Sequence, residues 1–163
     1  MTIPNVITFL RILLIPLFIY FLLIDPGMKI ASIIFVVIVL GDALDGVLAR
    51  FLKQTSDLGK FLDPLADKTL VLCALIGLVE LKIVSSLPVM IIGARELLVM
   101  GLRVSAASKG SIIPASSLAK WKTVFQFLAV FMLMLKLPYA TEVLWFAVVL
   151  TVLSGVEYFW LKK

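Results

Sequence analysis

The sequence contains no histidine and only one cysteine, Cys73, among its 163 residues. The absence of histidine excludes imidazole acid–base chemistry and histidine-ligated zinc. A single cysteine excludes an internal disulfide framework, and because Cys73 lies in an apolar run we interpret it as a small buried hydrophobe. Any catalysis by this chain therefore depends on carboxylates, lysines and arginines.

Charged residues are also scarce. They make up 15% of the chain, while 63% is hydrophobic and the mean hydropathy is +1.18. Soluble domains are about 45 to 50% apolar, and a membrane span needs about 20 apolar residues. The apolar blocks predict an all-α, polytopic membrane protein with six transmembrane helices. The polar breaks between them are too short for an extramembrane domain, so residues 1–163 are expected to form a single domain.

Turn and capping signals predict where the six helices begin and end. The expected spans are residues 5–24, 29–51, 59 or 63 to 80, 88–107, 118–135 and 141–160. Asp25-Pro26-Gly27 should form the first turn. Asp63 followed by Pro64 is typical of an N-cap and a first helical residue, and favours the later start for the third span.

Basic residues gather on alternate polar breaks, which predicts the orientation of the chain because cytoplasmic loops retain lysine and arginine. Only Lys29, Lys82 and Lys136 would face outward. The inner side would hold Arg50, Lys53, Lys60, Lys68, Arg103, Lys109, Lys120, Lys122, Lys162 and Lys163. We therefore expect a protein of the cell membrane with both termini in the cytoplasm. The net charge of +5 reflects this asymmetry. A basic inner surface faces anionic lipid, so a nucleic-acid partner is not needed to explain the charge.

Four aspartates stand at the edges of two strongly apolar predicted helices: Asp42, Asp45, Asp63 and Asp67. A carboxylate at the middle of a span costs on the order of 2.5 to 3.5 kcal/mol, so such residues rarely lack a function. Helical residues three or four apart share a face. A short connection predicts that the two helices are antiparallel neighbours whose acidic faces meet.

Such a group of carboxylates predicts a metal site, because the charges repel unless a divalent cation neutralises them. Oxygen donors without histidine or cysteine favour Mg²⁺ or Mn²⁺. The small residues Gly46, Ala49 and Gly59 would leave room for a phosphorylated ligand near the backbone. The alternative is that the aspartates are interfacial and pair with Arg50 and Lys68.

The spacing of these residues resembles the signature of the CDP-alcohol phosphotransferase family. The motif Asp42-x2-Asp45-Gly46-x2-Ala49-Arg50-x8-Gly59-x3-Asp63-x3-Asp67 agrees at eight fixed positions within 26 residues. The resemblance implies transfer of a substituted phosphate from a CDP-linked donor to an alcohol, with release of CMP. It further implies that Asp42, Asp45 and Asp63 are metal ligands and that Asp67 is a general base or a further ligand. The residues implied to bind the CDP-lipid are Asn5, Thr8, Asp45, Gly46, Ala49, Arg50 and Gly59.

Other segments resemble the bacterial family members that use glycerol 3-phosphate as the acceptor. They contain Arg95, Arg103, Lys120 and Lys122, which we expect to bind the acceptor phosphate. The chain departs from that pattern at Ala119, where a glycine is expected, and in residues 108–117. The resemblance implies that CDP-diacylglycerol and sn-glycerol 3-phosphate give phosphatidylglycerophosphate and CMP, in phospholipid biosynthesis. A homodimer is a family-level expectation.

Alternatives remain open from the sequence. Another acceptor, such as serine, inositol phosphate or phosphatidylglycerol, would use the same chemistry. Arg95 could pair with Glu96, and Arg11 could extend from the first span to the interface. A divalent-cation transporter would also use carboxylates, but the aspartates lie at one mouth of the membrane and no second half-repeat is present. The aromatics near span ends are interpreted as interface anchors: Tyr20, Trp121, Tyr139, Trp145, Tyr158 and Trp160.

Overall fold

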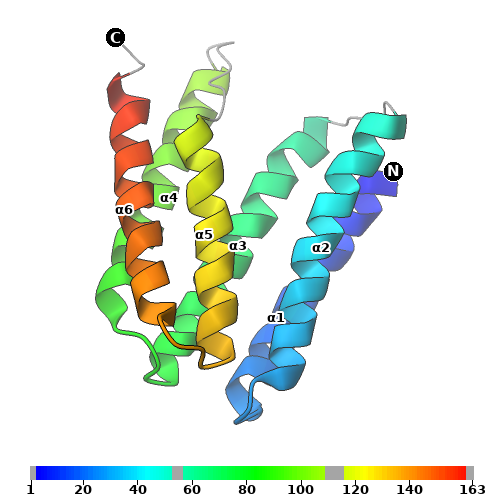
Figure 1. Cartoon of the computed structure of the whole chain (residues 1–163). Coiled ribbons are helices and arrows are strands. Elements are labelled where there is room, and N and C mark those ends of the chain that lie inside the picture. The colour runs from blue at the N-terminus through cyan, green and yellow to red at the C-terminus, as the bar shows by residue number, and fades with distance from the viewer. Residues whose placement is uncertain (1–2, 53–56, 109–115, 161–163) are drawn as a thin grey trace. The chain divides into compact units, whose positions relative to one another are not determined.

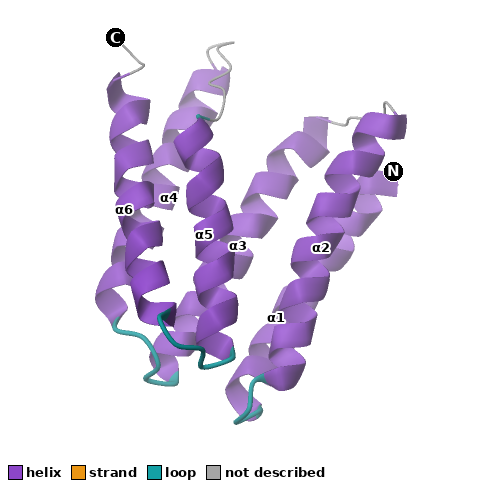
Figure 2. Cartoon of the chain, viewed as in Figure 1, coloured by secondary structure: helices purple, strands orange, loops and turns teal. Residues whose placement is uncertain are grey.

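A computed structural model of the chain describes residues 3–52, 57–108 and 116–160, and it places side chains within 10–41, 65–106 and 116–158. Every regular element in these ranges is a helix (Figures 1 and 2). The helices are α1 (Ile3–Ile24), α2 (Lys29–Leu52), α3 (Asp57–Glu80), α4 (Ser86–Ser108), α5 (Ser117–Met134) and α6 (Ala140–Trp160). The predicted all-α architecture of six helices is confirmed, and apart from the start of α3 every limit falls within two residues of its prediction.

The third helix begins earlier than predicted. Because α3 starts at Asp57, Asp63 and Pro64 lie inside the helix, and the prediction of an N-cap at Asp63 is wrong. A proline inside a helix removes one backbone hydrogen bond and costs about 3 kcal/mol. Membrane helices tolerate that loss when neighbouring groups satisfy the freed carbonyl. The helix therefore continues through Asp63 and Pro64, although these two residues locally favour a helix start.

The turn between α1 and α2 agrees with the predicted Asp25-Pro26-Gly27 sequence. The Asp25 carboxylate accepts hydrogen bonds from the backbone N–H of Gly27 at 3.0 Å and of Ile30 at 3.2 Å. Met28, with φ of 50°, takes the left-handed conformation that lets α2 start at the next residue. These hydrogen bonds, led by the one from Ile30, hold the pKa of exposed Asp25 below its usual value.

The chain divides into two compact units, Met1–Leu81 and Lys82–Lys163. In the first unit, α1 packs against both α2 and α3. Phe18 of α1 and Phe35 of α2 are buried with their ring centroids 5.8 Å apart. A Cβ on Gly77 of α3 would lie only 2.6 Å from Cδ2 of Leu22, so this glycine allows α1 and α3 to approach closely.

In the second unit, α6 packs against both α4 and α5. Phe125 and Phe146 meet edge to face, with centroids 4.7 Å apart. Gln126 of α5 donates a hydrogen bond from Nε2 to Oγ1 of Thr151 on α6 at 3.0 Å, and both residues are buried. The prediction that residues 1–163 form a single domain stays a prediction.

Several charged side chains are buried, while many large apolar side chains are exposed. Arg11, Arg95, Glu96 and Lys122 are buried, whereas the exposed positions include many leucines, isoleucines and valines along all six helices. A lipid-facing surface accounts for this pattern, since intramembrane charges face the protein interior. Among the described residues, α5 and the Ala140–Tyr158 part of α6 are long and apolar enough to cross a membrane.

Candidate active site

The four aspartates of the motif lie on two antiparallel helices of the first unit. Asp42 and Asp45 belong to α2, while Asp63 and Asp67 belong to α3, which runs back in the opposite direction (Figure 1). Among the described residues, α1 packs extensively against each of these helices, whereas α2 and α3 share at most a small contact there. Contact with α1 therefore supplies most of the packing that holds α2 and α3 in this unit.

Most side chains of the motif lie outside the described ones, although their backbones are helical. This applies to Asn5, Thr8, Asp42, Asp45, Gly46, Ala49, Arg50, Gly59 and Asp63. Their roles, and the alternative pairing with Arg50, thus stay predictions. The donor set itself fits the predicted metal, because four carboxylates at helical spacings of three and four offer only the oxygen ligands that Mg²⁺ and Mn²⁺ prefer.

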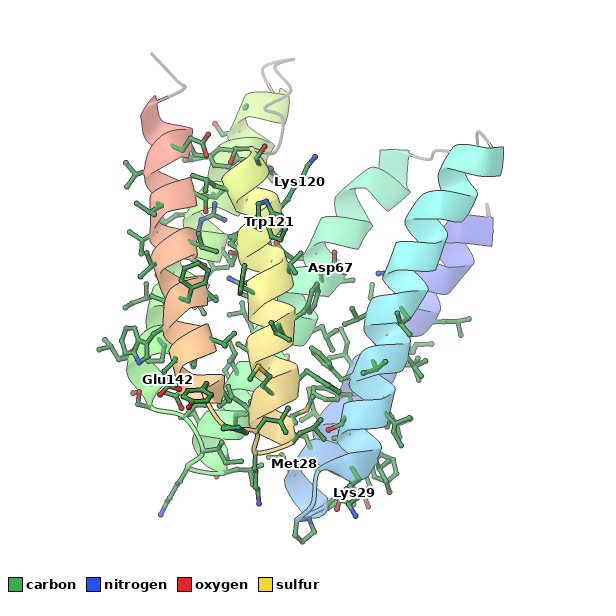
Figure 3. All side chains as sticks on the ribbon, in the orientation of Figure 1. Met28, Lys29, Asp67, Lys120, Trp121 and Glu142 are labelled. Atoms are coloured by element: carbon green, nitrogen blue, oxygen red, sulfur yellow. The ribbon has the colours of Figure 1, made fainter. Side chains whose placement is uncertain are left out.

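Asp67 is the motif aspartate whose side chain is described, and it lies on α3 (Figure 3). It forms an ion pair between helices, with its Oδ1 3.5 Å from Nη1 of Arg11 on α1. Arg11 is only 3% exposed, and its Cδ would lie 3.8 Å from a Cβ placed on Gly41, the residue before Asp42. The interpretation of Arg11 as extending to the interface is wrong. Instead, α1 places a buried positive charge beside the acidic motif.

A second charged cluster lies in the other unit, around Glu96 of α4. Nη1 of Arg95 donates to the two carboxylate oxygens of Glu96 at 3.3 and 3.4 Å. Nζ of Lys122 on α5 also donates to Oε1 of Glu96. All three residues are buried. The alternative of an Arg95–Glu96 pair is confirmed, and Glu96 also joins α4 to α5 through a shared carboxylate.

Residues of α6 complete this cluster. Nη2 of Arg95 donates to Oγ of Ser154 at 2.9 Å, and Nη2 of Arg103 donates to the hydroxyl of Tyr158. The guanidinium carbons of Arg95 and Arg103 lie 5.7 and 5.2 Å from the centroid of the Tyr158 ring, within cation–π range. A Cβ on Gly155 would lie 3.2 Å from Cγ of Arg95.

The structure brings together three of the four cations expected at the acceptor site. Arg95, Arg103 and Lys122 belong to this cluster, while Lys120 is exposed at the start of α5 (Figure 3). Lys120 and Lys122 are two residues apart and so do not share a helical face. Within the described residues, the buried Nε atoms of Arg95 and Arg103 have no hydrogen-bond acceptor. Two cationic donors are thus available to an anion.

Among the six aromatic residues interpreted as interface anchors, Tyr158 is the one whose interpretation is wrong. It is 3% exposed and contacts two arginines, so it is no interface anchor. The other described aromatics of that set are exposed, as anchors should be: Tyr20, Trp121, Tyr139 and Trp145. Trp160 lies outside the described side chains. The spacing of Ser154 and Tyr158, four residues apart on one polar face, was the available signal.

The chain is similar to known proteins over nearly its whole length. The model of the CDP-alcohol phosphatidyltransferase family matches residues 1–153. A Bacillus subtilis protein named CDP-diacylglycerol–glycerol-3-phosphate 3-phosphatidyltransferase is 40% identical, over 96% of this chain and 92% of its own length. Proteins with the same name from Rickettsia typhi and Haemophilus influenzae are each 37% identical. They cover 96% and 99% of this chain, and 94% and 93% of their own lengths, respectively.

Proposed function

The chain belongs to the CDP-alcohol phosphatidyltransferase family, and from that premise we propose that it transfers the phosphatidyl group of CDP-diacylglycerol to sn-glycerol 3-phosphate. The products are phosphatidylglycerophosphate and CMP, and the reaction belongs to phospholipid biosynthesis. Relatives of nearly equal length that carry this activity in their names support the proposal.

The observation that carries the choice of acceptor is the cation cluster of the second unit. The buried Arg95 and Lys122 and the half-buried Arg103 bring three positive charges, and the buried Glu96 brings one negative charge. The excess of two positive charges matches a phosphate monoester, which carries about −1.5 to −2 at neutral pH. Acceptors of zero net charge, such as the zwitterion serine, would leave the excess positive charge of these cations without compensation. The cluster therefore favours a phosphorylated alcohol.

The reaction exchanges one phosphorus–oxygen bond for another. The C1 hydroxyl oxygen of glycerol 3-phosphate attacks the phosphorus that bears diacylglycerol. The bond from that phosphorus to the bridging oxygen breaks, and CMP leaves with the electron pair. Asp67 accepts the proton of the attacking hydroxyl. Arg11 contributes by fixing one oxygen of the Asp67 carboxylate at 3.5 Å, so that the base keeps one orientation.

Mg²⁺ or Mn²⁺ fits the acidic motif, with Asp42, Asp45, Asp63 and also Asp67 as its proposed ligands. When bound, the metal would offset the pyrophosphate charge and stabilise the leaving CMP. The CDP-lipid is proposed to lie against the small residues Gly46, Ala49 and Gly59. The remaining proposed contacts to it are Asn5, Thr8, Asp45 and Arg50.

In this proposal the chain crosses the cell membrane six times, with both termini and the aspartates on the cytoplasmic side. The basic residues of the inner loops support that orientation. Cytoplasmic access suits the two soluble species of the reaction, glycerol 3-phosphate and CMP. The lipid substrate and product enter and leave sideways, and the proposed assembly is a homodimer.

Release of CMP from CDP-diacylglycerol, measured against a panel of acceptors with Mg²⁺ or Mn²⁺ present, tests the proposal. We expect glycerol 3-phosphate to support turnover and serine, inositol phosphate and phosphatidylglycerol to support little. Equal or faster turnover with one of the other three would contradict the acceptor. A metal flux into liposomes without CDP-lipid, with no CMP release under any condition, would instead favour a transporter.

A further inference from the structure

The end of α6 contains the polar residues that contact the two arginines of the acceptor cluster. Ser154 and Tyr158 accept hydrogen bonds from Arg95 and Arg103, and Gly155 lies directly against the side chain of Arg95. These three residues therefore help to set where the two guanidinium groups lie.

The hydrogen bonds of Arg95 fix which edge of its guanidinium is left for a ligand. Nη1 donates to Glu96, and Nη2 donates to Ser154 at 2.9 Å. The Ser154 hydroxyl itself donates to the Thr151 carbonyl at 3.0 Å, so its oxygen can only accept from Arg95. Nε is a buried nitrogen of Arg95 with no acceptor within the described structure, so its N–H can bind a ligand.

Arg103 is held in a similar way by Tyr158. Its Nη2 donates to the phenol oxygen, while Nε has no acceptor within the described structure. The face of the same ring lies within 6 Å of both guanidinium groups, at 5.2 and 5.7 Å. A ring that attracts both cations offsets part of the repulsion between them. The buried ring of Tyr158 thus holds the buried Arg95 and the half-buried Arg103 close together.

Gly155 provides the space that this arrangement needs. A Cβ at this position would lie 3.2 Å from Cγ and 3.5 Å from Nε of Arg95. The first distance is tighter than ordinary van der Waals contact, and it involves the middle of the side chain rather than its free end. An alanine would therefore move the open Nε edge of Arg95 by a few tenths of an ångström.

We propose that the end of α6 sets acceptor specificity, with Ser154, Gly155 and Tyr158 as positioning residues that aim the Nε donors of Arg95 and Arg103 at the phosphate of the acceptor. The inference rests on the proposed function and deepens it. The ligand class is a phosphate monoester dianion, which offers several oxygens to two separately held guanidinium edges. The lipid donor does not depend on these residues.

Gly155→Ala gives the sharpest test. In a helix interior alanine is more favourable than glycine by about 1 kcal/mol, so the variant should unfold in detergent at the same or a higher temperature. We expect the KM for glycerol 3-phosphate to rise at least fivefold and the KM for CDP-diacylglycerol to change less than twofold. The matched control is Gly101→Ala on α4, where a Cβ would meet nothing within 4 Å, and both KM values should stay unchanged.

Tyr158→Phe and Tyr158→Leu provide an independent series. Phenylalanine keeps the ring and removes the hydroxyl, while leucine removes both, so the KM for glycerol 3-phosphate should rise about threefold and then at least tenfold. If Gly155→Ala does not fold, this series tests whether the end of α6 positions the two arginines for the acceptor. Unchanged KM values for the acceptor, or equal rises for both substrates, would overturn the inference. A wild-type protein that is inactive with glycerol 3-phosphate would instead contradict the proposed function itself.

Discussion

The two units of this chain combine opposite charges in different ways. Among the described residues, Arg11 of Met1–Leu81 contacts Asp67 of an acid-rich motif, while Glu96 of Lys82–Lys163 pairs with the cations Arg95 and Lys122. Acids suit a metal and a leaving group, and cations suit a phosphorylated acceptor. Because unpaired buried charges are costly, Glu96 makes the burial of Arg95 and Lys122 tolerable, and Asp67 does the same for the buried Arg11.

This comparison predicts that substitutions in the first unit lower kcat, whereas substitutions in the second raise the KM of the acceptor. Asp67→Asn is expected to have the largest effect. Loss of a general base costs about 10² to 10⁴-fold, so kcat should fall within that range while both KM values stay within threefold. Steady-state CMP release measures all three quantities. Asp25→Asn, in the exposed turn, is the control, and an equal loss of activity in both variants would contradict the role of Asp67.

Glu96→Gln tests the counter-charge of the second unit. Removal of one partner of a buried ion pair typically costs 3 to 5 kcal/mol, because Arg95 and Lys122 then remain buried without their carboxylate. We expect the apparent unfolding temperature in detergent to fall by about 10 °C. The double variant Glu96→Gln/Lys122→Met should recover part of the loss. If the double variant is less stable than the single one, Glu96 is not acting as a counter-charge.

Arg11→Met tests the counter-charge of the first unit and should have a smaller effect, because Asp67 is only partly buried. A less firmly oriented base should lower kcat about tenfold, which corresponds to about 1.4 kcal/mol. Arg11→Lys, which keeps the charge, should fall between the wild type and Arg11→Met. The KM for glycerol 3-phosphate should not change. A rise in that KM with kcat unaffected would contradict the prediction that the first unit acts on kcat and the second on the KM of the acceptor.

The smallest effect is expected at Asp25, a carboxylate in neither cluster. Its pKa is lowered in the folded state, so its contribution to stability is present above the ordinary pKa of a carboxyl and is lost as the pH falls through the lowered value. The wild type should therefore unfold at a slightly higher temperature than Asp25→Ala at pH 7, and this difference should shrink as the pH falls through the lowered pKa and vanish below it. If the difference in unfolding temperature grows on acidification, the folded state does not stabilise the ionised form of Asp25.

Local signals in the sequence were enough to predict the helices and the acidic motif. Apolar runs, the Asp25 turn and the spacing of the aspartates all act within one helix or one turn. The ion pairs were harder to predict because they join residues far apart in the chain. Arg11 and Asp67 are separated by 56 positions, and Arg103 and Tyr158 by 55. Which residue of α6 meets which residue of α4 depends on packing that no local pattern reports.

The hydrogen bond between Gln126 and Thr151 has a consequence for the chemistry at the start of α5. In lipid there is little hydrophobic force to set the rotation of one helix against another, and polar contacts contribute to it. Each residue of a helix turns the chain by roughly 100°. A slip of α5 by one position would turn Lys122, one turn before Gln126, away from Glu96. The Gln126–Thr151 hydrogen bond and the Lys122–Glu96 ion pair therefore fix the rotation of α5 together.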